Sequence, residues 1–110
     1  MSTARWKQLK SDAALRENLS LRAKAADAVR AFFKARRYLE VETPILVAKP
    51  GMEPFLSPFR TEVRDPRGNS YEGHLITSPE YAMKELLVAG FPKIFQLTKC
   101  FRNGEDFGGR

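Results

Sequence analysis

The chain has 110 residues, a formal net charge of +6 and one cysteine, Cys100. A hydrophobic content of 43% supports a packed core and excludes a wholly disordered chain, while one cysteine excludes a disulfide framework and a cysteine-based zinc site. The sequence contains neither an apolar run of about 18 residues nor the apolar stretch of a secretory signal, so we expect a cytoplasmic protein without a membrane-spanning helix.

Residues 12–37 are predicted to form a helix. Leu21, Ala25, Val29 and Phe32 recur at helical spacing, and a second apolar stripe lies beside them, so we expect this helix to pack against more than one neighbour. Residues 1–37 carry ten Lys/Arg and three Asp/Glu, whereas the remainder is close to neutral. This charge predicts an acidic partner, either nucleic acid or protein; the alternative is an ordinary solvated helix face.

Strands are predicted next in the chain. Residues 38–44 alternate between apolar and polar side chains and stop at Pro44, whereas residues 45–58 are rich in proline and are expected to be irregular. Residues 59–64 and 71–77 are predicted to pair as a hairpin, because the residues between them favour turns.

A second helix is predicted to start at Glu80 and to stop at Gly90. Thr77 or Ser78 is expected to cap it, and Pro79 suits its first turn. The structural interpretation of this segment is ordinary helix capping. The functional interpretation is that the Glu80 carboxylate binds a substrate ammonium group beside hydroxyl and backbone groups.

Residues 94–102 are predicted to form the last strand, with Phe95, Leu97 and Phe101 in the core. Arg102 ends this strand, and its planar guanidinium is suited to binding phosphate oxygens in pairs, although a plain surface turn is the alternative. A glycine-rich loop follows and no return strand is present, so we expect the sequence to be a fragment of a longer protein. His74 and Cys100 are interpreted as structural residues, since neither has the spacing of a metal or nucleophile motif.

The ordered set of segments resembles the class II aminoacyl-tRNA synthetases of the lysyl type. The segments that carry the resemblance are Leu39-Glu40-Val41-Glu42-Thr43-Pro44, Thr77-Ser78-Pro79-Glu80 and Phe101-Arg102-Asn103-Gly104-Glu105. The resemblance implies an α+β fold, with an antiparallel sheet flanked by helices that is incomplete in this chain. It assigns residues 1–19 to a basic lead-in and residues 20–110 to the front of the catalytic domain, with the first signature at 20–44 and the start of the second at 94–110.

Within this family, the pattern is most similar to the branch that attaches (R)-β-lysine to elongation factor P. The lysyl-tRNA synthetases carry an anticodon-binding barrel before the first signature, and we expect none here, because only about twenty residues precede that signature. The branch implies lysine or β-lysine as substrate, ATP and Mg²⁺ as cofactors, elongation factor P as acceptor and a homodimer. The open alternatives are a lysyl-tRNA synthetase fragment acting on lysine tRNA, and a non-catalytic module that only binds a partner.

The resemblance also implies a reaction in which an amino acid is activated as its adenylate and then transferred. It assigns roles in that reaction to single residues. Arg102 is implied to bridge the α-phosphate of ATP and the substrate carboxylate as the catalytic residue. The amino-acid pocket is implied to be lined by Ser78, Pro79 and Glu80; ATP is implied to contact Arg102, Asn103, Gly104 and Glu105; and the dimer interface is implied to include Pro44. The magnesium ligands are implied to lie outside these residues, so we predict that the chain alone forms no adenylate.

Overall fold

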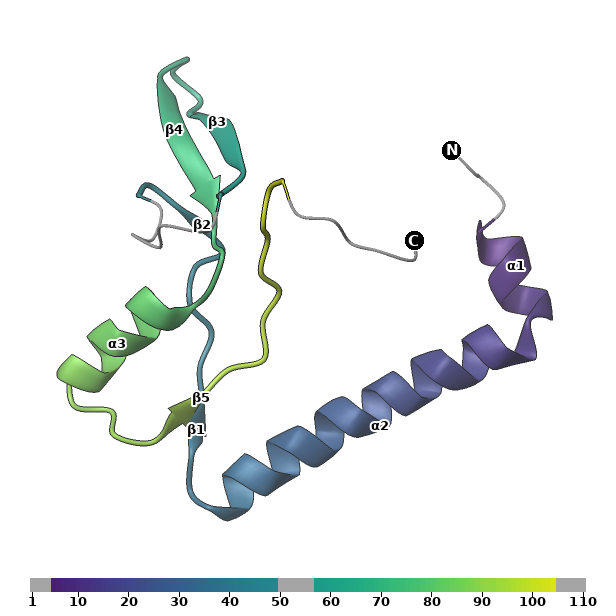
Figure 1. Ribbon diagram of the computed structural model, residues 1–110. Coiled ribbons are helices and arrows are strands. Elements are labelled where there is room, and N and C mark those ends of the chain that lie inside the picture. Colours follow the sequence, from purple (N-terminus) through teal and green to yellow (C-terminus); the bar gives the residue numbers. More distant parts are fainter. Residues whose placement is uncertain (1–4, 50–56, 105–110) are drawn as a thin grey trace. The chain divides into compact units, whose positions relative to one another are not determined.

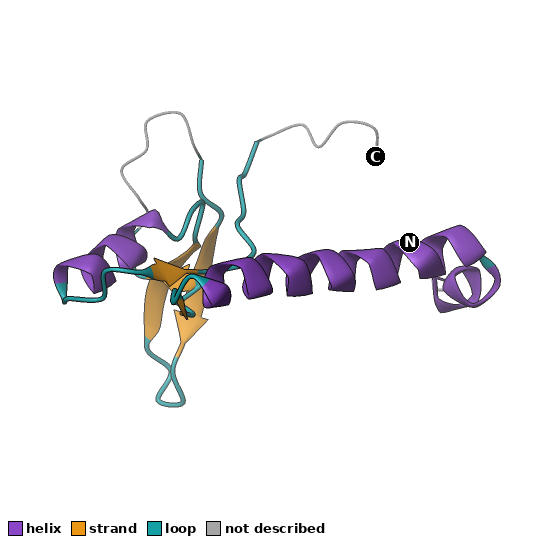
Figure 2. Cartoon of the chain, turned by 90° about the horizontal axis from the view of Figure 1, so that it is seen from below, coloured by secondary structure: helices purple, strands orange, loops and turns teal. Residues whose placement is uncertain are grey.

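The computed structural model describes residues 5–49 and 57–104, which divide after Glu40 into two compact units that we describe separately. Both helices and small sheets are present, in agreement with the predicted α+β class (Figures 1 and 2).

The first unit is mainly helical. It contains α1 (Arg5–Ser11) and α2 (Ala13–Ala35), so the predicted helix over 12–37 is confirmed in position, whereas α1 was not predicted. Asp12 separates the two helices, and its carboxylate accepts the backbone N–H groups of Ala14 at 3.0 Å and Leu15 at 3.2 Å. This cap gives α2 a fixed start, because it satisfies two donors that have no partner within the helix.

The end of α2 is fastened to β1 (Leu39–Glu40). The Arg30 Nε lies 2.8 Å from a Glu40 carboxylate oxygen, and the ring of Phe33 meets that of Tyr38 edge to face at 5.3 Å. Arg37 turns the chain between them with φ of +66°, a left-handed conformation that is uncommon outside glycine.

The expected apolar face of α2 is exposed in this structure. Within residues 5–40 no side chain is buried, and Leu21 and Phe32 keep 62% and 50% of their accessible surface. The expectation that α2 packs against several neighbours is therefore not met by the part of the chain that is described.

The second unit contains a three-stranded antiparallel sheet in the order β2-β4-β3. Its strands are β2 (Leu46–Val47), β3 (Arg60–Arg64) and β4 (Ser70–Leu75). The predicted hairpin is confirmed. Residues 45–58, in contrast, were expected to be irregular. β2 corrects that expectation at Leu46 and Val47, which pair with Leu75 and His74, while residues 50–56 lie outside the described residues.

Asp65 builds the turn of the hairpin. Its carboxylate accepts the N–H groups of Arg67 and Asn69 at 2.9 Å and the Asn69 side-chain amide at 3.0 Å. Gly68 completes the turn with φ of +88°, which favours glycine.

Close packing on one face of the sheet requires Gly73 in β4. A Cβ atom there would lie 2.9 Å from Val63 Cγ2 and 3.0 Å from Leu46 Cδ1, closer than van der Waals contact allows. The opposite face is polar, and on it Arg60 and Glu72 form an ion pair at 3.2 Å. The hairpin therefore separates an apolar face from a charged one.

Helix α3 (Glu80–Val88) follows β4 and stops at Gly90, as predicted, where φ is +108°. The predicted cap needs a correction, because Pro79 occupies the N-cap position and makes no side-chain cap bond. The Ser78 hydroxyl nevertheless accepts the Glu80 N–H at 3.1 Å, so it satisfies one donor at the helix start.

The two long predicted strands are shorter in the structure. Only Leu39–Glu40 of residues 38–44 and only Ile94–Phe95, which form β5, of residues 94–102 are strands. After β5, the Gln96 side chain replaces a backbone partner for Thr43. Its Oε1 accepts the Thr43 N–H at 2.8 Å, and its Nε2 donates to the Thr43 hydroxyl at 2.9 Å. A side chain thus satisfies a backbone donor that strand pairing leaves free.

The core of the second unit is small. Its buried apolar residues are Ile76 and Phe95, and its buried polar residues are His74 and Thr77. Phe95 confirms its predicted place in the core, whereas Leu97 is 40% exposed and corrects the prediction, because the strand that would alternate its side chains ends at Phe95.

Candidate functional site

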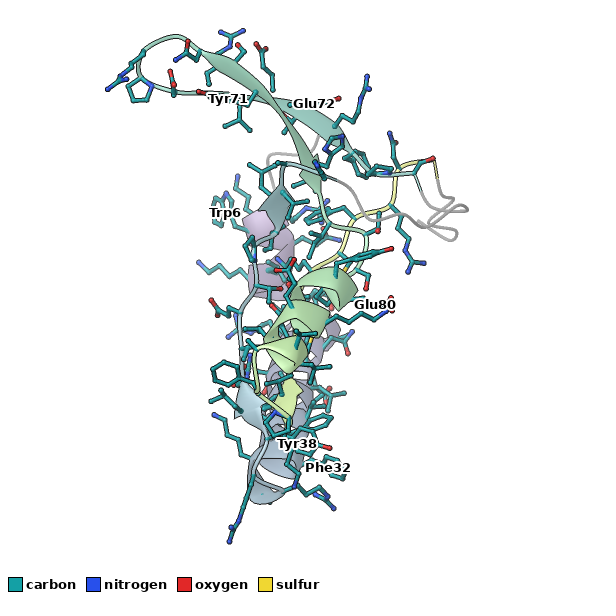
Figure 3. The ribbon with its side chains drawn as sticks, turned by 90° about the vertical axis from the view of Figure 1, so that its left-hand side faces the viewer. Trp6, Phe32, Tyr38, Tyr71, Glu72 and Glu80 are labelled. Carbon is teal, nitrogen blue, oxygen red and sulfur yellow. The ribbon has the colours of Figure 1, made fainter. Side chains whose placement is uncertain are left out.

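The first candidate segment, residues 77–80, connects β4 to α3. Thr77 is buried, Ser78 and Pro79 are half-buried, and Glu80 is exposed at the first turn of α3. Figure 3 shows Glu80 on α3, away from Tyr71 and Glu72 on the hairpin. The exposed carboxylate at a helix start is accessible to a ligand.

The second candidate segment, residues 101–104, lies beside the first. The Phe101 N–H donates to the Ile76 carbonyl at 2.8 Å, and the Asn103 N–H donates to the Ser57 carbonyl at the same distance. Ile76 immediately precedes the first segment, and Arg102 lies between the two bonded residues of the second. Two segments about 25 positions apart in the chain are thereby held next to each other.

The backbone bonds also fix how the second segment runs. Ser57 and Asn103 form an antiparallel bridge, and Gly104 turns the chain with φ of +76°. Arg102 is exposed, so its guanidinium is accessible from solvent. The predicted ATP-binding residue Glu105 lies outside the described residues.

A hollow of about 240 Å³ lies at the strand-to-helix junction. The hollow lies between the segment around β2 and the start of α3. Its lining consists of Pro44, Val47, Lys49, Ile76, Thr77, Ser78, Pro79, Tyr81, Ala82 and Glu85. Three predicted site residues, Pro44, Ser78 and Pro79, therefore share one hollow. Glu80 is not among its lining residues.

The charge on Glu80 is paired with a cation from its own helix. Lys84 Nζ lies 2.8 Å from a Glu80 carboxylate oxygen, one helical turn away. The same ammonium lies 6.0 Å from the centre of the Tyr81 ring. Carboxylates and aromatic faces both attract ammonium groups, so this end of α3 provides the surroundings that such a group needs.

The carboxyl groups with lowered pKa values lie outside these two segments. A hydrogen bond from Arg30, together with the nearby Lys34, lowers the pKa of Glu40. On the hairpin, bonds from Ser70 and then Arg64 lower the pKa of Glu62, and bonds from Asn69 lead the causes that lower the pKa of Asp65. These shifts are consequences of folding contacts and do not mark a catalytic acid or base.

The described residues provide no ready metal site. Within 5–49 and 57–104, no three His, Cys, Asp or Glu side chains gather in a way that could hold a metal ion. We therefore assign no magnesium ligand to this part of the chain and derive no step through a metal ion. In the same residues, no helix has the length and apolar character to cross a membrane.

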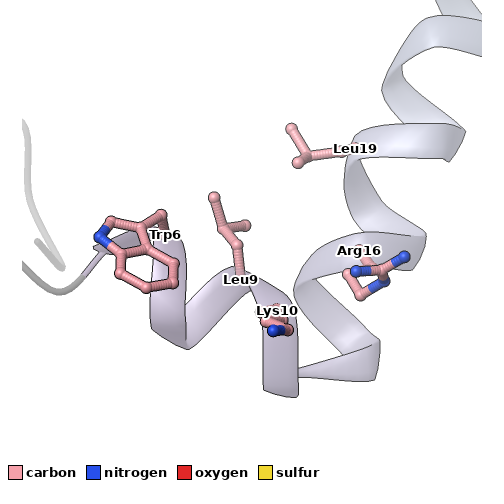
Figure 4. A pocket seen from close by; sticks show the side chains of 5 residues that line it. All are labelled: Trp6, Leu9, Lys10, Arg16 and Leu19. Atoms are coloured by element: carbon pink, nitrogen blue, oxygen red, sulfur yellow. The ribbon is translucent and has the colours of Figure 1, made fainter.

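The first unit carries a hollow of its own, of about 400 Å³, where α1 meets α2. Trp6 and Leu9 of α1 and Leu19 of α2 form its apolar part, and Lys10 and Arg16 add positive charge (Figure 4). This exposed basic surface of the chain is compatible with the predicted acidic partner, although the sequence did not predict α1.

Sequence reasoning missed Lys84 and Tyr81 beside the candidate segments. A Glu four residues before a Lys on a predicted helix is a recognised pairing signal, and it was available for Glu80 and Lys84. The Gln96 contact with Thr43 had no such signal, since the two residues are 53 positions apart.

A family model described as tRNA synthetases class II (D, K and N) matches residues 2–108. The chain is also similar to curated proteins that are named elongation factor P–(R)-β-lysine ligase. It is 47% identical to one from Pectobacterium atrosepticum over 90 residues, which are 81% of this chain and 28% of the relative. It is 47% identical to one from Haemophilus influenzae over 95 residues, which are 86% of this chain and 29% of the relative.

A third relative, from Aquifex aeolicus, is named a homolog of the same ligase and is 47% identical over 77 residues, or 70% of this chain and 26% of the relative. The chain thus spans less than a third of the length of the relatives it matches.

Proposed function

The chain belongs to the class II tRNA synthetase family, and from this premise we propose that it is the front part of an ATP-dependent ligase that activates lysine or β-lysine and transfers it to elongation factor P. The observation that carries the proposal is the bond from the Phe101 N–H to the Ile76 carbonyl, because it brings the segment of Arg102 next to that of Ser78–Glu80. The names of the relatives support the choice of substrate and acceptor.

In the proposed reaction, a substrate carboxylate oxygen attacks the α-phosphorus of ATP and pyrophosphate leaves. A nucleophile of the acceptor then attacks the carbonyl carbon of the adenylate, and AMP leaves. Both reactants of the first step are anionic, so fixed positive charge is needed where they meet. We assign this task to Arg102, whose guanidinium can bind a phosphate oxygen and a carboxylate oxygen together.

The remaining residues bind and orient the substrates. We assign Ser78 and Pro79 to the wall of the amino-acid pocket and Glu80 to the substrate ammonium, which its exposed carboxylate supports. Asn103 and Gly104 are assigned to ATP, and either Glu105 or the Gly104 backbone to its adenine. ATP and Mg²⁺ enter as expectations of the family.

We also propose that the complete protein is a cytoplasmic homodimer with Pro44 at its interface. Pro44 is exposed, and its apolar neighbours Ile45 and Leu46 are exposed as well. Large exposed apolar side chains of this kind are typical of a surface that another protein covers. Sedimentation of the complete protein should give a dimer mass, and Ile45→Glu should shift it to the monomer.

The test of the proposed activity uses a joined enzyme, in which this chain replaces the matched part of the Haemophilus influenzae relative. We expect it to catalyse lysine- or β-lysine-dependent exchange of pyrophosphate into ATP, while the 110 residues alone give no exchange. A joined enzyme that folds, binds ATP and shows no exchange would contradict the proposal.

The acceptor is tested separately with the same enzyme. Mass spectrometry should detect the aminoacyl group on elongation factor P, with tRNA left unmodified. Acylation of lysine tRNA instead would assign the chain to a lysyl-tRNA synthetase, for which the basic first unit would serve equally well.

A further inference from the structure

We propose that Lys84 is a built-in counterion of Glu80 that the ammonium group of the substrate must displace, so that Lys84 limits how tightly lysine binds. This inference rests on the proposed function, because it takes Glu80 as the residue that binds the substrate ammonium.

The geometry around Lys84 is that of a bound ammonium group. Its Nζ lies 2.8 Å from the Glu80 carboxylate and 6.0 Å from the centre of the Tyr81 ring. A carboxylate together with an aromatic face is a common way to recognise an ammonium ion. The chain therefore presents, with its own lysine side chain, the contacts that a lysine substrate would make.

Both members of the pair belong to one helix. Glu80 precedes Lys84 by four residues on α3, which is the favourable order for an ion pair on a helix. The Glu80 and Lys84 side chains retain 52% and 63% of their accessible surface, so the carboxylate is accessible and the contact is weak enough to exchange.

Displacement follows from the repulsion of like charges. Two ammonium groups on one carboxylate lie within a few ångströms of each other, and this repulsion favours departure of one of them. Lys84 has a flexible four-carbon stem and can move its charge into solvent, whereas the bound substrate cannot. A ligand without a positive charge has no means of replacing Lys84, so the pair also favours cationic substrates.

The experiment measures exchange kinetics of the joined enzyme with Lys84→Met, which removes the charge and keeps a long side chain. We expect the KM for lysine or β-lysine to fall about two- to fivefold, the range that an exposed ion pair supplies, with the KM for ATP unchanged. Lys84→Arg should keep the original KM, because it keeps the cation.

The matched control is Arg64→Met, which removes the cation of another exposed pair, that of Arg64 and Glu62 at 3.2 Å on the hairpin. It should leave both KM values unchanged. An unchanged or raised KM for lysine in Lys84→Met would overturn the inference, since a raised value would mean that Lys84 orients Glu80 instead.

Glu80→Gln separates failure of this inference from failure of the proposed site. If Glu80→Gln raises the KM for lysine and Lys84→Met does not lower it, only the counterion role is wrong. If neither variant changes that KM, Glu80 does not bind the substrate, and both the counterion role and the proposed site are wrong.

Discussion

The two units of the chain differ in how they are held together. In residues 5–40 the contacts are local: helical hydrogen bonds, the Asp12 cap and the pair of Arg30 and Glu40, with no side chain buried. From Val41 on, the contacts join distant segments, such as the bonds from Val41 to Phe95 and from Phe101 to Ile76, around a small buried core. The candidate site lies in the second unit, where distant segments meet.

The comparison predicts that the same truncation, phenylalanine to alanine, lowers the free energy of unfolding more in the second unit than in the first. In the 110-residue chain, Phe95→Ala should lower the free energy of unfolding by about 3–5 kcal/mol, because Phe95 is only 5% exposed. Phe32→Ala should change it by about 0.5 kcal/mol or less, because half of that side chain is already in water. Urea unfolding followed by circular dichroism measures both, and equal losses would mean that the two units do not differ in this way.

A smaller effect is expected for added volume in the second unit. Gly73→Ala should cost about 1–3 kcal/mol, because the new methyl group meets Val63 Cγ2 at 2.9 Å. The cost should shrink when the same change is made in a Val63→Ala background, which removes that contact. Thermal unfolding of the four proteins gives the coupling, and additive losses would show that Val63 does not crowd this position.

The smallest predicted effect is a dependence on pH. The folded-state pKa of Asp65 is lowered from its ordinary value of 3.8, mainly by bonds from Asn69. A lowered pKa stabilises the folded state above the unfolded value, and that contribution is lost as the pH falls from 3.8 through the folded pKa. The Glu40 contribution is lost in the same direction, below its ordinary value of 4.5.

Urea midpoints at pH 6 and pH 3 test this dependence. Asp65→Asn should make the difference between the two midpoints smaller. An Asp65→Asn protein with the full difference would contradict the assignment.

Local signals in the sequence predicted the elements whose causes are local. The apolar spacing predicted α2, the turn residues around Gly68 predicted the hairpin, and Gly90 predicted the end of α3. The α1 helix was missed because seven residues give too short a pattern to recognise.

Contacts between distant segments were not predictable in the same way. Alternation over residues 38–44 and 94–102 indicated strands, but a strand needs a paired neighbour along its whole length, and the structure shows ladders only at Leu39–Glu40 and Ile94–Phe95. The hollow that joins Pro44 to Ser78, and the pairing of Thr43 with Gln96, depend on the folded arrangement. The resemblance to a known family identified both candidate segments, whereas their contact through Ile76 and Phe101 required the structure.

The most direct test of the central claim is the pyrophosphate exchange rate of the joined enzyme with Arg102→Ala. We predict a fall of about 10²- to 10³-fold, the cost of removing one donor that stabilises a developing negative charge. The matched change Arg67→Ala, at the exposed turn of the hairpin, should leave the rate unchanged. An Arg102→Ala enzyme that keeps its full lysine-dependent rate would contradict the claim and favour a module that binds a partner without catalysis.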